Sequence, residues 1–477
     1  MSTFRTILSA TLAVSLASCG GGGGGGSSPP TGPIGGGATG GGGTGAEGCS
    51  LASRKDWVLS QLNEWYLFPD LLNTSVAPAN YPTVQQYIDA LVAKANEEKK
   101  DRGFTYITSI REENALIQSG ANAGFGIRLA YDETARTLTV VEAFENAPAF
   151  AAGFDRGTQI LAINGQSVAE LFASGGDDAV FLALGPSDPG VSRSFAIQNP
   201  GEPERTVTVA KAEYSLDPIS DRYGAKIFVT EGRKIGYVNL RTFIVQSADS
   251  QLRTAFAEFK AQGVEQVILD LRYNGGGLIS AADTLGDLMA EDKVGRVFSQ
   301  TVFRPSKSAE NETRLFQAKP QAIAPSKIAV IGREGTASAS ELVTNSMLAY
   351  YGANIGLIGT DTYGKPVGQI ALDRSACDDR LRAVALKTTN ANGQGEYYTG
   401  LASVMQATCR AEDDLSTQLG NPAEASIATA LNYLAGRSCT PITGEAAKGT
   451  TAQRASEREL LMSRQPSAAQ LQVPGLF

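Results

Sequence analysis

Histidine is absent from the 477-residue sequence, and this absence excludes several kinds of catalytic machinery. A Ser-His-Asp triad, a zincin-type metal site and an imidazole proton shuttle all need at least one histidine. A serine nucleophile in this chain therefore needs a different base. The common substitute among convergent hydrolases is a lysine that its surroundings hold neutral.

Long runs of basic residues are missing as well. The chain has 41 Lys and Arg against 49 Asp and Glu, a net charge of -8. This balance argues against a nucleic-acid partner and against electrostatic binding to anionic membranes. We therefore expect protein or peptide partners. The length predicts about two or three domains.

The N-terminus has the pattern of a targeting segment. Arg5 precedes a mostly apolar stretch, residues 7–16, that is too short for a permanent membrane span, which predicts a secretory signal over residues 1–19. Its last four residues resemble a bacterial lipobox, which implies a lipid on Cys19; a plain signal peptide with a chance cysteine is the alternative. Residues 20–48 are glycine-rich and predict a flexible linker. We expect an exported, membrane-anchored lipoprotein that faces the periplasm or the cell exterior.

Cysteine is scarce, with five in the whole chain. Besides Cys19 there are four: Cys49, Cys377, Cys409 and Cys439. An even number in an exported protein predicts up to two disulfides, and four cysteines allow three pairings. We favour Cys377 with Cys409 and Cys49 with Cys439. Because none has a C-x-x-C spacing, we expect no metal site, redox centre or other cofactor.

Hydrophobic periodicity divides the rest of the chain. Residues 49–115 read as a helical subdomain, in which Val58, Leu62 and Trp65 share one helix face. Residues 213–440 alternate between strands and helices, which argues for an α/β core with crossover connections. Its expected strands cover 235–240, 267–271, 328–331 and 355–358. The final stretch, residues 441–477, shows little periodicity and is expected to be a poorly packed tail.

Between these parts, residues 120–212 predict a β-rich domain of short strands and turns. It opens with Gly124, Phe125, Gly126 and Ile127, and its order of elements resembles a PDZ domain of the bacterial protease-associated type. The resemblance implies that this loop receives a peptide carboxylate while the peptide adds a strand to the sheet edge. A β-rich subdomain without a ligand is the alternative.

Ser338 lies between a predicted strand that ends near Gly332 and a predicted helix that begins near Glu341. A serine at this turn faces the positive end of the helix dipole, which favours developing negative charge. The alternative is an ordinary N-cap, a role that Ser340 fits well.

Lys365 follows Ser338 by 27 residues, beyond one helix and one strand, so a return of the chain could bring it to the nucleophile. Gln369 would lie on the same face of a strand as Lys365 and could orient its amine. Gly275 and Gly276 follow a buried strand and offer unhindered N–H groups that suit an oxyanion hole.

Several segments resemble the C-terminal processing peptidases of serine peptidase family S41. They are Asp101 to Tyr106, Asp270 to Gly277, Ala337 to Glu341, and Tyr363 to Lys365 followed by Gln369. The resemblance implies Ser338 as nucleophile, Lys365 as general base and Gln369 as its orienter. The N–H groups of Ala339 and of either Gly275 or Gly276 would form the oxyanion hole. It also implies a multidomain α/β fold with a crotonase-like β/α core, and a serine endopeptidase that captures protein tails.

The chain departs from the family pattern near the base. The Ser-to-Lys spacing is slightly longer than usual, and Pro366 follows the lysine where glycine is common, which fixes φ and removes a donor. Two other functions stay open: a non-catalytic binding protein on the same fold, and a Ser-Lys esterase. The sequence does not indicate the oligomeric state.

Overall fold

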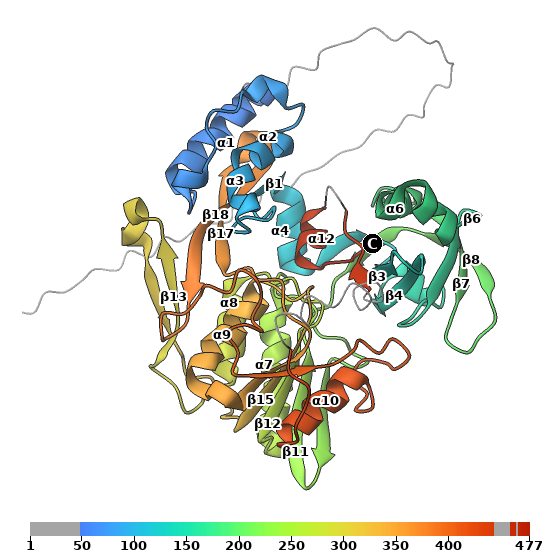
Figure 1. Cartoon of the computed structure of the whole chain (residues 1–477), viewed down its shortest axis with the longest axis vertical. Helices are drawn as coiled ribbons and strands as arrows, with labels where there is room; N and C mark the ends of the chain where they lie inside the picture. The colour runs from blue at the N-terminus through green and yellow to red at the C-terminus, as the bar shows by residue number, and fades with distance from the viewer. Residues whose placement is uncertain (1–47, 443–457, 464–465) are drawn as a thin grey trace, which may run out of the picture. The chain divides into compact units, whose positions relative to one another are not determined.

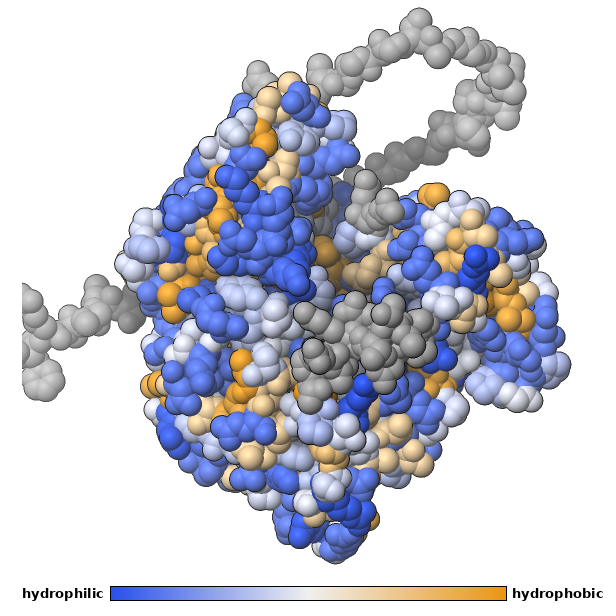
Figure 2. Space-filling view, viewed as in Figure 1, coloured by the Kyte–Doolittle hydropathy of each residue, from blue (hydrophilic) through white to orange (hydrophobic). Residues whose placement is uncertain are grey.

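The computed structural model describes residues 48–442, 458–463 and 466–477 (Figure 1). The predicted signal segment with Cys19, and the linker up to residue 47, lie outside the described residues. Within the described ranges, every helix is too short or too polar to cross a bilayer. The face shown in Figure 2 is mostly hydrophilic, with small apolar patches among polar side chains.

A six-stranded central sheet has the order β10-β11-β12-β15-β16-β19. Its strands are β10 (Ala225–Thr230), β11 (Arg233–Asn239), β12 (Gln266–Asp270), β15 (Lys327–Gly332), β16 (Ile355–Gly359) and β19 (Ala407–Arg410). All neighbours pair in parallel except β10 and β11. The four core strands predicted from the sequence are confirmed to within about two residues at each end.

Helices cover both faces of this sheet (Figure 1). On one face lie α7 (Ser247–Gln262), α8 (Ile279–Leu288) and α9 (Ala339–Tyr351), and on the other α10 (Ala425–Leu434). Along β12, Val267 and Leu269 pack with the first group, whereas Ile268 packs with α10. Burial on both faces explains why the parallel strands are almost continuously apolar.

A second sheet joins the N-terminal helical part of the chain to the core. Its order is β1-β18-β13-β14, with β17 also paired to β18. The strands are β1 (Tyr106–Ser109), β13 (Val297–Phe303), β14 (Glu312–Leu315), β17 (Val367–Arg374) and β18 (Asp379–Thr389). Helices α1 (Leu51–Trp65), α2 (Val84–Leu91) and α3 (Ala93–Glu97) share a hydrophobic core with β17 and β18. The N-terminal helices therefore pack beside Lys365, which directly precedes β17.

The β-rich part forms a third sheet in the order β20-β3-β4-β5-β7-β8, with β6 on β5. Its strands are β3 (Ile127–Asp132), β4 (Thr137–Ala143), β5 (Gln159–Ile163), β6 (Gln166–Ser167), β7 (Ser192–Gln198), β8 (Arg205–Ala210) and β20 (Glu459–Leu460). Helices α5 (Pro148–Ala151) and α6 (Val168–Leu184) accompany it. A short antiparallel pair, β2 (Ala121–Gly124) and β9 (Ala212–Ser215), and helix α4 (Ile110–Ser119) connect it to its neighbours.

The prediction of a poorly packed tail is wrong for the described residues of 441–477. Leu461 and Val473 are fully buried, and Phe477, the last residue of the sequence, is 4% exposed. Strand β20 pairs with β3, and helix α12 (Ala468–Gln472) packs against α4. Sparse periodicity did not reveal this packing because the segment contributes only single side chains to cores built elsewhere.

The predicted disulfide pairing is also wrong. The structure joins Cys49 to Cys377 and Cys409 to Cys439, with Cα atoms 5.5 and 5.4 Å apart. Cys377 lies in the turn between β17 and β18, beside the start of α1, whereas Cys409 lies in β19, next to the segment that carries Cys439. Packing of the N-terminal helices on the second sheet therefore decides the pairing.

Peptide mapping without reduction should find Cys49 linked to Cys377 and Cys409 linked to Cys439. The double variant Cys49→Ser/Cys377→Ser should lose about 2–5 kcal/mol of unfolding free energy, because the bond closes a very long loop. Denaturant unfolding measures this loss. A peptide that links Cys377 to Cys409 would contradict the fold around α1.

Candidate active site

Ser338 sits at the turn between β15 and α9, immediately before the first residue of the helix. Its backbone has φ +55° and ψ -114°, a conformation that residues other than glycine rarely adopt. Backbone strain of this kind clusters at functional sites. The N-cap alternative does not hold for Ser340, because Ser338 is the N-cap residue of α9. Ser340 lies in the first turn of the helix, where its hydroxyl donates to the Asn274 carbonyl at 3.0 Å.

A buried carboxylate, Glu341, ties the Ser338 turn to the segment that carries Lys365. One of its oxygens, Oε2, accepts from the N–H of Ser338 at 3.0 Å and from the N–H of Lys365 at 2.7 Å. The other, Oε1, accepts from Gly364 N–H at 2.7 Å and from the Thr362 hydroxyl at 2.5 Å. Burial raises the pKa of Glu341 to about 7, although these hydrogen bonds oppose the rise.

In the sequence, Glu341 indicates only the start of a helix. The signal that could have identified it is its spacing from Ser338, since a Glu three residues after a serine N-cap reaches back to the cap N–H in a capping box. The further bonds to residues 362–365 come from a distant turn, which no local pattern predicts.

The amine of Lys365 contacts Gln369, the residue that the sequence suggested would orient it. Nζ donates to Gln369 Oε1 at 3.1 Å and lies 4.7 Å from the centre of the Phe104 ring. Gln369 Nε2 in turn donates to the Phe104 carbonyl, which leaves Oε1 to face the lysine. Among the described residues, Nζ has no hydrogen bond to Ser338 Oγ, and the two residues are linked instead through their backbone N–H groups, which share Glu341 Oε2.

Burial changes the proton affinity of Lys365. Desolvation lowers its pKa to about 8, and the nearby Arg382 also lowers it, whereas the charges of Asp101 and Glu341 raise it. A buried lysine with this pKa is about one-tenth neutral at pH 7. It can therefore accept a proton near neutral pH.

The segment after α3 packs beside the side chains of Lys365 and Gln369. Asp101 is fully buried and accepts from Phe104 N–H, Thr105 N–H and the Thr105 hydroxyl at 2.8, 3.0 and 2.6 Å. This turn fixes the Phe104 carbonyl on which Gln369 depends. Arg102 donates to the Tyr363 and Gly364 carbonyls at 2.6 and 2.8 Å, which fastens the turn before Lys365.

The structure distinguishes between the two glycines proposed for the oxyanion hole. Gly276 N–H donates to Asn274 Oδ1 at 2.9 Å. By contrast, the N–H groups of Gly275 and Ala339 have no hydrogen-bond partner in the described part of the chain. A Cβ on Gly276 would lie 2.7 Å from Ser338 Cβ, so the glycine allows close approach of the two loops. Gly275 and Ala339 are thus the available pair of donors.

The predicted peptide loop lies where β2 ends and β3 begins. The N–H groups of Gly126 and Ile127 both donate to the main-chain oxygen of Phe477, at 2.8 and 3.1 Å. A Cβ on Gly124 would lie 3.0 Å from the Phe477 carbonyl carbon, and the Phe125 ring packs edge-on against Phe195. The loop therefore holds a main-chain oxygen in this structure.

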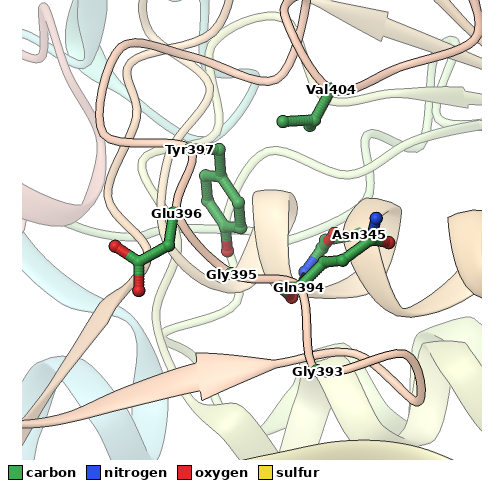
Figure 3. A pocket seen from close by; sticks show the side chains of 7 residues that line it. All are labelled: Asn345, Gly393, Gln394, Gly395, Glu396, Tyr397 and Val404. Atoms are coloured by element: carbon green, nitrogen blue, oxygen red, sulfur yellow. Dashed lines mark hydrogen bonds between the residues drawn. The ribbon is translucent and has the colours of Figure 1, made fainter.

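A shallow surface pocket elsewhere holds none of these residues. It lies beside α9 and is lined by Asn345, Gly393, Gln394, Gly395, Glu396, Tyr397 and Val404 (Figure 3). In the close-up, the side chains around the hollow come from α9 and from the loops that follow β18. No group of three or more His, Cys, Asp or Glu is placed to hold a metal ion within the described residues.

Comparison with known proteins shows which proteins the chain resembles. Residues 234–396 match the model of peptidase family S41, and residues 53–106 match the peptidase S41 N-terminal domain. A carboxyl-terminal-processing protease of Picosynechococcus is 27% identical over 250 residues, covering 52% of this chain and 55% of the relative. The carboxy-terminal processing protease CtpA of Bacillus subtilis is 24% identical over 323 residues, covering 67% and 64%.

The fold has a solved counterpart in a candidate S41 protease of Bacteroides fragilis. The two superpose with a TM-score of 0.61 at 23% identity, over 80% of this chain and 97% of the other. The chain therefore shares its fold with an S41 protease. Over the two matched segments the chain resembles peptidase family S41, and it spans little more than half the length of the first curated relatives that it matches.

Replacing Glu341 by Gln should loosen the site. The new NH₂ group would face either the N–H groups of Ser338 and Lys365 or the Gly364 N–H and the Thr362 hydroxyl, so at least one hydrogen bond is lost and one buried N–H is left unpaired, at a cost of about 1–3 kcal/mol. Denaturant unfolding near pH 8.5, where Glu341 is ionised, measures this loss. Glu258→Gln on the exposed side of α7 is the matched control, and equal stability of the two variants would refute the role of Glu341.

Proposed function

We propose that this chain is a serine endopeptidase whose catalytic unit is Ser338, Lys365 and Gln369. The observation that carries the proposal is the shared Glu341 oxygen, which binds the N–H groups of nucleophile and base while Gln369 holds the base amine. This unit needs no histidine, in agreement with the composition.

In the first step, neutral Lys365 takes the hydroxyl proton of Ser338 as Oγ bonds to the scissile carbonyl carbon. The carbonyl oxygen becomes negatively charged and is stabilised by the N–H groups of Gly275 and Ala339, aided by the N-terminus of α9. The C–N bond then breaks, and the protonated lysine gives its proton to the leaving amine.

In the second step, water replaces the amine. Lys365, neutral again, takes a proton from water as the hydroxide bonds to the acyl carbon of the ester on Ser338. The C–Oγ bond breaks, and the proton returns from lysine to the serine oxygen. Both half-reactions therefore use the same base and the same oxyanion donors.

The β-rich sheet supplies a way to hold a substrate. We infer that it is a PDZ-like domain attached to a crotonase-like core and that it engages C-terminal tails of proteins. The N–H groups of Gly126 and Ile127, which bind the Phe477 oxygen in this structure, would receive a peptide carboxylate, and a peptide that displaces residues 475–477 would add as a strand along β3.

The cysteines support an extracytoplasmic location. Two disulfides form among the described residues, and disulfides persist mainly in oxidising compartments. We propose an exported lipoprotein, anchored through Cys19, that cleaves proteins or peptides in the periplasm or at the cell exterior.

Ser338→Ala and Lys365→Ala should each lose casein hydrolysis by at least about a hundredfold while staying folded. Ser250→Ala and Lys260→Ala, on the exposed face of α7, are the matched controls and should keep full activity. Gel analysis of casein cleavage with circular dichroism of each variant provides the measurement.

Full activity of Ser338→Ala would refute the nucleophile. A folded wild-type protein that cleaves aryl esters but no peptide would favour the esterase alternative, and one that cleaves neither would favour the binding protein.

The pH profile of kcat/KM should follow the protonation of Lys365. Because the pKa is lowered to about 8, activity should rise about tenfold per pH unit below pH 8 and level off above it. Arg382→Gln removes a positive charge that lowers this pKa, so its profile should move to higher pH. A profile that is flat between pH 6 and 9 would contradict lysine as the base.

A further inference from the structure

The last residues of the sequence lie along the first residues of β3, on the same side of the strand as β20. Gly475 O accepts from Leu129 N–H at 2.8 Å, and Phe477 N–H donates to Ile127 O at 2.8 Å. Phe477 O then accepts from the Gly126 and Ile127 N–H groups. These are the bonds of an antiparallel strand that ends in the loop expected to receive a peptide end.

The side chains of this segment are seated in apolar surroundings. The Phe477 ring joins the core of the β-rich sheet and packs edge-on against Phe181, with centroids 5.9 Å apart. Leu476 and Val473 pack into a second cluster, and they are 1% and 0% exposed. Burial of these three side chains favours docking by several kcal/mol in total.

The same segment lies against the proposed oxyanion hole. A Cβ on Gly275 would lie 3.0 Å from Gln472 O and 2.9 Å from Pro474 Cδ. Gly275 itself is buried, and its N–H has no partner in the described part of the chain. The segment between α12 and Phe477 therefore lies directly against Gly275, whose N–H a substrate carbonyl would need.

We propose that residues 466–477 are a built-in occupant of the peptide groove that holds the peptidase closed, and that peptides of the same chemistry displace it. This regulation rests on the proposed function. The matching ligand has an aromatic last residue for the Phe477 position, a small residue at the Gly475 position and apolar residues between and before them.

Glycine at position 475 is required by the path of the chain. Its φ is +80°, and a Cβ there would lie 3.0 Å from both Leu129 O and Arg128 Cγ. A displacing peptide therefore needs glycine, or a different local path, two residues before its aromatic end. Because of this requirement, the groove should accept fewer peptides than it would if it selected for apolar residues alone.

The occupant competes as an intramolecular ligand. A tethered segment acts at an effective concentration on the order of millimolar, so it weakens the binding of a free peptide without any change in the groove. Removing the Phe477 side chain should abolish most of this competition.

The test uses a fluorescein-labelled synthetic peptide with the sequence of residues 468–477. Its binding is measured by anisotropy in Ser338→Ala protein, which cannot cleave it, with and without Phe477→Ala or Leu476→Glu. Met462→Ala is the matched control, because this residue belongs to the same terminal part of the chain and is 39% exposed. Hydrogen exchange of residues 272–278 is followed in the same proteins.

We expect Phe477→Ala and Leu476→Glu to bind the peptide at least about tenfold tighter than the Ser338→Ala parent, and Met462→Ala to match the parent. Exchange at 272–278 should become faster only in the first two. In protein that keeps the native Ser338, Phe477→Ala should raise casein hydrolysis severalfold. Equal peptide affinity in parent and Phe477→Ala protein, unchanged exchange, or an unchanged Ser338-dependent casein rate would each overturn the proposal. If no variant cleaves casein, the proposed function fails, and binding and exchange still decide whether the groove is occupied.

Discussion

The buried carboxylate of Glu341 is the interaction on which the site depends. Placing a carboxylate in the interior is costly, and its raised pKa reports that cost. Four donors offset it, and two of them are the N–H groups of Ser338 and Lys365. Because the donors come from two separate turns, satisfying one buried charge also fixes the spacing between the backbones of Ser338 and Lys365.

A second set of contacts completes the pocket from parts of the chain that are far apart in sequence. Asp101 shapes the turn that presents the Phe104 carbonyl, this carbonyl orients Gln369, and Gln369 holds the Lys365 amine. Asn274 plays a similar part for the glycine loop, since its carbonyl accepts from Ala337 N–H and Ser340 Oγ. The helical N-terminal region and the core thus build one site together.

Sequence patterns predicted what is local or repeated. The central strands were predictable because burial on both faces makes them continuous apolar runs, and the contact of Lys365 with Gln369 was predictable from residue chemistry and motif order. The longer spacing and Pro366 did not prevent contact between Lys365 and Gln369, although Lys365 lies just before β17 rather than within it.

The features that the sequence did not predict all depend on long-range packing. The disulfide pairing follows from α1 packing against β17 and β18, and the role of Glu341 follows from the approach of residues 362–365. The burial of Phe477 depends on a groove formed more than three hundred residues earlier in the chain. In each case the residue itself can be picked out in the sequence, but the residue that it contacts is brought close only by the fold.

Labelling with a fluorophosphonate probe tests the central claim most directly, because it reads the nucleophile without depending on a protein substrate. The account predicts a single adduct on Ser338 by peptide mass mapping, with a labelling rate that rises with a midpoint near pH 8 and is lost in Lys365→Ala. An adduct on another residue, or undiminished labelling of Ser338 in Lys365→Ala, would contradict it.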